Sequence, residues 1–254
     1  MNWLSRLLGT RPTPQLIDDA LWQAQLARMP GLEDLPAERN ARWRELTSRF
    51  LADKAISAAG NCELSDADRV LIAMLCCEPV LDLGYRWLRG WHEVIVYPGE
   101  FGVRRHHVDE DSGVVHEWDD TLSGECWEQG PVILSLADTI QAAEQPLSGY
   151  QVVVHEIAHK LDLLDGSLDG VPPLHDAGWH AQWAADFQSA YDRLCAQLEA
   201  GEEPPIDPYA CEAPDEFFAV VSEYHFTDPE LLAEHLPAVA AHLARFYHPA
   251  LLAA

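Results

Sequence analysis

The chain has 254 residues, of which 42 are acidic and 16 basic, so its formal net charge is −26 at pH 7. Nucleic-acid backbones are bound by clustered Lys and Arg, so this charge argues against nucleic acid as a partner. Hydrophobic residues make up 48% of the sequence, which is typical of a folded globular protein and excludes a disordered chain.

The sequence also argues against a membrane or exported protein. No apolar run approaches the roughly 18 residues of a membrane-spanning helix. Residues 1–8 are too short and polar for the apolar part of an export signal, so we expect residues 1–14 to form a flexible tail. The six cysteines show no regular spacing, which predicts neither disulfides nor a cysteine zinc site. We therefore expect a cytoplasmic protein whose metal ligands are His and carboxylate.

The first part of the chain is predicted to be helical. From residue 36 to about 59, Trp43, Leu46 and Phe50 recur at helical spacing. Ser65 is typical of a helix N-cap and precedes an apolar helix, and helical character continues over residues 81–88. We expect residues 15–90 to form an N-terminal helical region.

Strands are predicted next, at residues 92–97 and 130–136, with a hairpin around residues 111–113. We expect strand 131–136 to border the active-site cleft, where an extended peptide can add to it through main-chain hydrogen bonds.

Helices follow the strands. Residues 150–164 give the strongest helix prediction, and Gly166 ends that helix. Further helices are expected over residues 179–198, 214–226 and from 228 onward. This order of elements favours an α+β fold with a small mixed sheet. Residues 91–254 are expected to form the catalytic region, in one compact unit with the N-terminal helices.

The chemical signature is the HExxH motif formed by His155, Glu156 and His159. On a helix the two histidines lie on one face, about 6 Å apart along the axis, where both can bind one zinc ion. Glu156 lies about 100° around the helix, beside the ion, where it can act as a general base. The opposite flank is apolar, so the helix is expected to bury that flank and present the histidines to a cleft.

A catalytic zinc site needs a third protein ligand and an open position. Asp165 stands six residues after His159, but the motif with a ligand there requires Gly three residues after the second histidine, and Asp162 occupies that position. Glu216 opens the predicted helix at 214–226. A carboxylate in a first helical turn is also stabilised by the helix dipole, so the residues alone leave the assignment of Glu216 open.

A resemblance to a known family bears on this choice. The segments GWHEVIVYP, PVILS, HEIAHKLD and IDPYACEAPDEFFAVVSEY occur in this order. They resemble the zinc peptidases of the Mlc titration factor A family, and the resemblance extends over roughly residues 15–250. The HExxH helix and the Tyr…EFF segment also resemble the catalytic domain of anthrax lethal factor.

The resemblance implies a zincin-like metallopeptidase core with one Zn²⁺ per chain. The implied ligands are His155, His159 and Glu216, with Glu156 as general base. Tyr209, seven residues before Glu216, is implied to direct its hydroxyl at the active site. A phenol stays protonated near neutral pH, so it can hydrogen-bond the oxyanion that develops during peptide hydrolysis.

Two further carboxylates are candidates for orienting the imidazoles. Asp162 lies on the same helix face as the histidines, and Glu223 lies on the Glu216 helix; either can accept the outer N–H of a ligand histidine. A surface or structural role is the alternative for both.

Other residues have less definite interpretations. His106 and His107, beside Asp109, Glu110 and Asp111, could bind a second metal, although a solvated polar hairpin is the simpler interpretation. Trp127 and Trp179 are predicted to lie either in the core or in a substrate subsite.

These features predict a zinc-dependent metallopeptidase that hydrolyses peptides, with an aminopeptidase as one form. The family name implies an alternative, a protein that binds and titrates a transcriptional repressor of the Mlc type, with a structural or modulatory zinc. Glu156 distinguishes the two functions, because a purely structural zinc site has no use for it.

Overall fold

The computed structural model describes residues 16–30, 35–108, 115–126, 130–146 and 148–249, with only the backbone described within 103–122 and 125–126. The expected tail, the turn at 111–113 and Trp127 lie outside these residues. So do Asp109, Glu110 and Asp111, together with the side chains of His106 and His107. The possible second metal site therefore stays a prediction.

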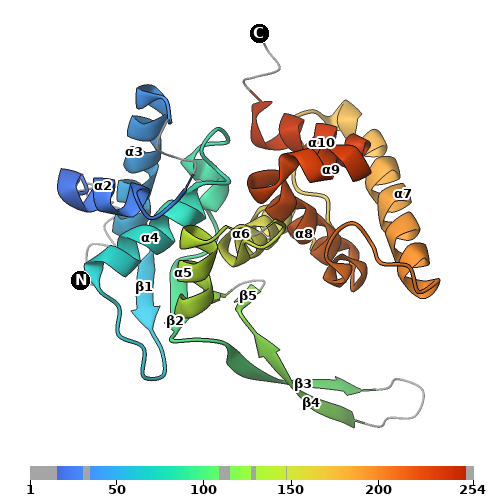
Figure 1. Ribbon diagram of the computed structural model, residues 1–254, viewed down its shortest axis with the longest axis horizontal. Coiled ribbons are helices and arrows are strands. Elements are labelled where there is room, and N and C mark those ends of the chain that lie inside the picture. The colour runs from blue at the N-terminus through green and yellow to red at the C-terminus, as the bar shows by residue number, and fades with distance from the viewer. Residues whose placement is uncertain (1–15, 31–34, 109–114, 127–129, 147, 250–254) are drawn as a thin grey trace.

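Helices form most of the described chain (Figure 1). The α-helices are α2 (Asp19–Leu26), α3 (Ala37–Asp53), α4 (Asp66–Cys77), α5 (Leu136–Glu144), α6 (Val152–Asp162), α7 (His180–Glu199), α8 (Pro214–Thr227), α9 (Pro229–His235) and α10 (Pro237–Tyr247). The 3₁₀ helices are η1 (Tyr85–Leu88), η2 (Leu163–Asp165), η3 (Ala177–Trp179) and η4 (Pro208–Cys211). The helices predicted over 150–164, 179–198 and 214–226 are confirmed.

Local sequence signals account for several helix ends. The Ser65 hydroxyl accepts the Asp68 N–H, and the Asp68 carboxylate accepts the Ser65 N–H, which forms a capping box at the start of α4. Pro214 is the first residue of α8, where its missing N–H is not needed. Gly166 takes a left-handed conformation with φ +98° and ends the turn after α6.

The central sheet has the order β1-β2-β6-β5, with strands β1 (Ala55–Ala58), β2 (Glu93–Tyr97), β6 (Val132–Ser135) and β5 (Gly124–Cys126). The first three are parallel, and β5 is antiparallel to β6. The α+β class, the small mixed sheet and the predicted strands are thus confirmed. The expectation that strand 131–136 offers a free edge is wrong, because β2 and β5 occupy both edges of β6; the outer strand is β5.

A second, two-stranded sheet consists of β3 (Phe101–Val108) and β4 (Val115–Leu122), which pair antiparallel. This is the hairpin predicted around residues 111–113. Figure 1 shows it extending away from the helices and the central sheet.

The structure corrects three helix predictions. The helix expected up to residue 59 ends at Asp53, because the next segment is extended and pairs as β1, with Ile56 opposite Val94. Helical structure does not continue from α4 to residue 88. It stops at Cys77 and resumes only as η1, since Pro79 cannot supply a helical N–H. Likewise, the helix expected from residue 228 is divided into α9 and α10 before Pro237.

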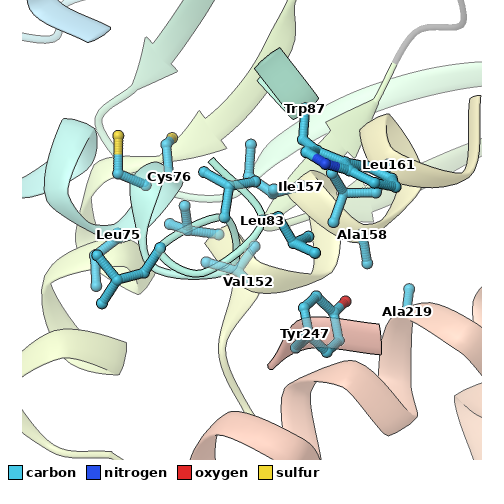
Figure 2. Close-up of a cluster of buried hydrophobic side chains, with 14 of the residues drawn as sticks. Leu75, Cys76, Leu83, Trp87, Val152, Ile157, Ala158, Leu161, Ala219 and Tyr247 are labelled. Carbon is cyan, nitrogen blue, oxygen red and sulfur yellow. The ribbon is translucent and has the colours of Figure 1, made fainter. Parts of the chain in front are cut away.

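The buried side of α6 packs into the core (Figure 2). Ile157, Ala158 and Leu161 are fully buried and lie near side chains from α4, η1, α8 and α10, among them Cys76 and Tyr247. This packing fixes the orientation of α6, so its other flank, with the histidines, faces away from the core. The same buried cluster includes residues from both the 15–90 and the 91–254 regions.

Candidate metal centre

The helices α6 and α8 bring three potential metal ligands together. On α6, His155 and His159 lie on one face, as the four-residue spacing predicts, and their Nε2 atoms are 3.2 Å apart. The Glu216 Oε2 atom, in the first turn of α8, lies 3.0 Å from His155 Nε2 and 3.4 Å from His159 Nε2. Among the described residues, these three form the group of His, Cys, Asp and Glu side chains placed to hold a metal ion.

The three atoms have the spacing that a tetrahedral zinc ion requires. Zinc binds nitrogen and carboxylate oxygen at about 2.0–2.2 Å, so two of its ligand atoms are separated by roughly 3.3 Å. The observed separations of 3.0, 3.2 and 3.4 Å match this value. Facing ring nitrogens repel each other unless a cation or proton lies between them, so the donor set fits a bound metal.

Asp165, the other candidate for the third ligand, is not part of this group. Its side chain is exposed, and its Oδ1 accepts the Ser167 N–H at 3.1 Å. It therefore stabilises its own turn at the end of α6.

Glu223 connects α8 to the start of α6. Its Oε1 lies 2.8 Å from His155 Nδ1, and its Oε2 accepts the Gln151 N–H at 2.5 Å. We assign the proton to Nδ1 of His155, since a carboxylate must accept it; this leaves the Nε2 lone pair for a metal.

The carboxylates around His155 favour positive charge at this point. Burial lowers the pKa of His155, but hydrogen bonds with Glu216 and Glu223 outweigh burial, and the pKa lies well above its ordinary value. Burial also raises the pKa of Glu216, and hydrogen bonds with His155 and His159 reverse this effect, so the net pKa is low. Glu216 is thus held as a carboxylate, the form that binds a cation.

Glu156 has a different environment. Its side chain is buried, and burial raises the pKa of the carboxyl to about 7. Its Oε2 has no hydrogen-bond partner among the described residues. Gly124 of β5 makes room for the other oxygen: a Cβ at that position would lie 2.3 Å from Glu156 Oε1. Gly124 could not be predicted from the sequence, because a single glycine in a short strand has no specific signature.

Tyr209 of η4 also lies at the centre. Its hydroxyl donates a hydrogen bond to Glu216 Oε1 at 3.3 Å, and its side chain is 43% exposed. The Asp207 carboxylate accepts the Tyr209 N–H at 2.9 Å, which fixes the turn that presents the ring. The phenol is therefore reachable from solvent and next to the ligand group.

Asp162 does not hydrogen-bond to either ligand histidine. Its Oδ2 accepts the backbone N–H groups of Asp169 and Gly170, while its Oδ1 and the Nδ1 of His159 are buried without a partner among the described residues. Trp179 is 2% exposed and donates its indole N–H to His242, so it is a core residue and not a substrate subsite.

A helix-borne HExxH pair joined by a distal glutamate within an α+β fold is the arrangement of a metallopeptidase centre. The chain belongs to the glucose-regulated metallo-peptidase M90 family, whose model matches residues 5–248. This confirms the family predicted from the motifs.

Several relatives of this chain are named Mlc titration factor A. The protein from Salmonella arizonae is 40% identical over 233 residues, covering 90% of this chain and 90% of the relative. Those from Salmonella typhi and Salmonella agona are each 39% identical over 234 residues, covering 91% of this chain and 86% of the relative. In the part of the chain that the structure describes, no helix is both long and apolar enough to cross a membrane.

Proposed function

We propose that this protein is a zinc-dependent peptidase whose metal is held by His155, His159 and Glu216. The observation that carries the proposal is the triangle formed by their three ligand atoms. Beside it lies a buried carboxyl, one oxygen of which has no hydrogen-bond partner in the described part of the chain. When bound, zinc supplies Lewis acidity, which lowers the pKa of a water molecule to about 7 and polarises a carbonyl oxygen.

The protein's own side chains then have distinct tasks. Glu156 accepts a proton from the attacking water and delivers it to the leaving amine. Its burial, which raises the pKa of the carboxyl in the metal-free chain, keeps bulk water away from the carboxylate. Tyr209 exchanges its hydrogen bond with Glu216 for one to the carbonyl oxygen as that oxygen gains negative charge.

The test of the general base is the substitution Glu156→Gln. The amide keeps the shape of the side chain but cannot accept the proton, so hydrolysis should fall by about 10²–10⁴-fold while the zinc content is unchanged. Zinc is measured by elemental analysis and hydrolysis with an internally quenched peptide. Hydrolysis at the parental rate would exclude Glu156 as the base.

Aminopeptidase activity is a narrower form of the same function. It can be tested with chromogenic amino-acid anilides, compared with the same anilides blocked at the amino group. Each assay is run with and without a chelator. Cleavage of the free compounds alone supports an aminopeptidase, and cleavage of internal peptide bonds supports an endopeptidase.

A second candidate function follows from the name of the relatives, which refers to Mlc. Identity of 40% over 90% of both chains favours a shared partner, a transcriptional repressor of the Mlc type. The Glu156→Gln variant separates the two functions in a pull-down with such a repressor: binding should survive the loss of hydrolysis. A variant that neither binds nor cleaves would indicate that the two depend on each other.

A further inference from the structure

A cavity of about 80 Å³ opens beside the helix turn that carries Glu216. It lies where the loop after α6 meets α7 and the start of α8, and its lining includes Gly170, Val171, Ala184 and Phe217. No step of the proposed reaction uses this cavity. Its lining, its size and its neighbours therefore indicate what it holds.

The most buried part of the lining is apolar and well packed. Phe187 and Phe217 are 6% and 1% exposed, and their rings meet edge to face with centroids 5.8 Å apart. The ring of Tyr191, another lining residue, packs on Phe217 in the same way, at 5.9 Å. Aromatic rings that hold each other in this way form a preformed surface for an apolar group.

Exposed residues form the rim of the cavity. Asp169, Gln188 and Pro214 belong to the lining and are exposed to solvent. The Asp169 carboxylate accepts the Val171 N–H at 3.1 Å, which fixes the turn at this side of the rim. The cavity is thus reachable from solvent. An apolar interior with a few polar groups at the mouth is typical of a binding pocket.

The volume of the cavity limits the size of the group that fits. An apolar protein cavity of roughly 150 Å³ holds benzene, which has six carbon atoms. The cavity described here has about half that volume. It therefore matches an aliphatic side chain of roughly three or four carbon atoms, the size of valine or leucine.

One wall of the cavity is the helix turn with the candidate ligand. Pro214 and Phe217 line the cavity, and Glu216 lies between them in the first turn of α8. Gly170 brings the loop against this turn, since a Cβ at that residue would lie 2.4 Å from the Pro214 carbonyl oxygen. With a rise of about 1.5 Å per residue, the cavity lies within one helical turn of Glu216.

A second wall is connected to Tyr209. Tyr191, on the α7 side of the cavity, donates its hydroxyl hydrogen bond to the Cys211 carbonyl at 3.0 Å. Cys211 ends η4, the short helix whose Tyr209 hydroxyl contacts Glu216. An extended peptide advances about 3.3 Å per residue, so a substrate at the candidate metal centre reaches the cavity within a few residues.

We propose that this cavity is a specificity pocket that takes one aliphatic side chain of the peptide substrate close to the scissile bond. The proposal rests on the proposed function and adds a substrate class to it, namely peptides with a residue the size of leucine or valine at one position. Burial of that side chain adds binding free energy. The kcat/KM of such a peptide should therefore exceed that of its glycine counterpart by about 10–100-fold.

The test uses internally quenched peptides in which leucine, phenylalanine or glycine is placed at each position in turn within an alanine background. The measured quantity is the ratio of kcat/KM between the leucine and the glycine peptide. Both values come from the same preparation, so differences in the amount of folded protein cancel. The parental chain should show the 10–100-fold preference for leucine at one position.

Two substitutions change the cavity in opposite directions. Ala184→Leu fills it from the α7 side and should remove the preference for leucine over glycine. Val171→Ala enlarges it and should shift the preference from leucine toward phenylalanine. Ala185→Leu is the matched control, because it adds the same side chain at the next residue of α7, where the alanine is exposed. It should keep the parental ratio.

Peptide cleavage by the parental chain with no preference for leucine at any position would overturn this inference and leave the proposed function intact. The parental ratio in Ala184→Leu would also overturn it, as would an equal loss in Ala185→Leu. If Ala184→Leu cleaves too slowly to measure, Val171→Ala decides, and an unchanged ratio of phenylalanine to leucine cleavage overturns the inference. If the parental chain with zinc cleaved none of the peptides, the proposed function would fail and this inference with it.

Discussion

Two glutamates of the candidate metal centre differ in what surrounds them. Glu216 faces two imidazoles, which hold its pKa well below the ordinary value, whereas burial raises the pKa of Glu156 to about 7. Environments that separate the pKa values of neighbouring acids are typical of sites where one acid stays charged and the other moves protons. The local contacts therefore support the different tasks proposed for the two residues.

Gly124 provides a test of how strictly Glu156 must be placed. In Gly124→Ala the new Cβ would lie 2.3 Å from Glu156 Oε1, so the carboxylate must move. We expect kcat to fall by about 10²-fold, the effect of a displacement near 1 Å, with unchanged zinc content. Gly102→Ala is the control, since a Cβ there meets nothing within 4 Å. Parental kcat in Gly124→Ala would mean that the position of Glu156 is not critical.

At the scale of elements, the centre depends on the packing of α6 against α8. Glu223 joins them: one oxygen lies at His155 Nδ1, and the other accepts the N–H of Gln151, the N-cap residue of α6. Orientation of a ligand histidine by a carboxylate contributes to metal affinity because it fixes the ring and its tautomer.

The substitution Glu223→Gln should lower zinc affinity by about 10–100-fold, because a neutral amide holds the Nδ1–H more weakly. Isothermal titration calorimetry of the metal-free chains measures this. Glu230→Gln, on the exposed start of α9, is the control and should bind zinc like the parent. Equal affinities in all three chains would show that Glu223 does not support the metal.

The positions of the helices, strands and candidate ligands could be predicted from the sequence only in part. The spacing of His155 and His159 predicts their shared face, because a helix has a fixed period. Glu216 could be selected only through the resemblance, because its distance from His155 in space depends on how α6 and α8 pack. Strand β1 was missed since the segment AISA has no strand signature and is stabilised by pairing with β2. Helix α5 has no counterpart among the predicted elements, and α2 is covered only by the expectation of a helical region over residues 15–90. The contact of Asp162 with the loop at 169–170 is tertiary and has no local signal in the sequence.

At the scale of the whole molecule, metal binding should stabilise the folded chain, because the ligands converge only after folding. At a free zinc concentration about 1,000 times Kd, the gain in unfolding free energy is about 4 kcal/mol. For a chain of this size it corresponds to a rise in Tm of roughly 8–16 °C. Differential scanning calorimetry with zinc and with chelator measures the shift. The Glu216→Ala variant should show a much smaller rise in Tm on adding zinc. A rise equal to that of the parental chain would mean that the metal binds elsewhere.

Acid should destabilise the packing of α8 on α10 through His225. Burial lowers the pKa of His225 to about 3, with His248 contributing, and its Nε2 lies 3.3 Å from that of His248. Because the folded pKa is lower than the unfolded value of 6.5, its contribution to stability is present above pH 6.5 and is lost as pH falls toward 3. His225→Phe should weaken this decline in unfolding free energy, measured by urea denaturation across this range. His180→Phe, at an exposed position, should keep the parental profile.

The distance along the chain between the two halves of the centre has a consequence for biosynthesis. His155 and Glu216 are 61 residues apart, and the intervening segment includes the whole of α7. A ribosome releases the HExxH helix well before the segment that completes the ligand set, and domains generally fold once their full sequence has emerged. The unfinished polypeptide therefore lacks the complete ligand group of the proposed centre, so neighbouring nascent chains are not exposed to that centre during translation.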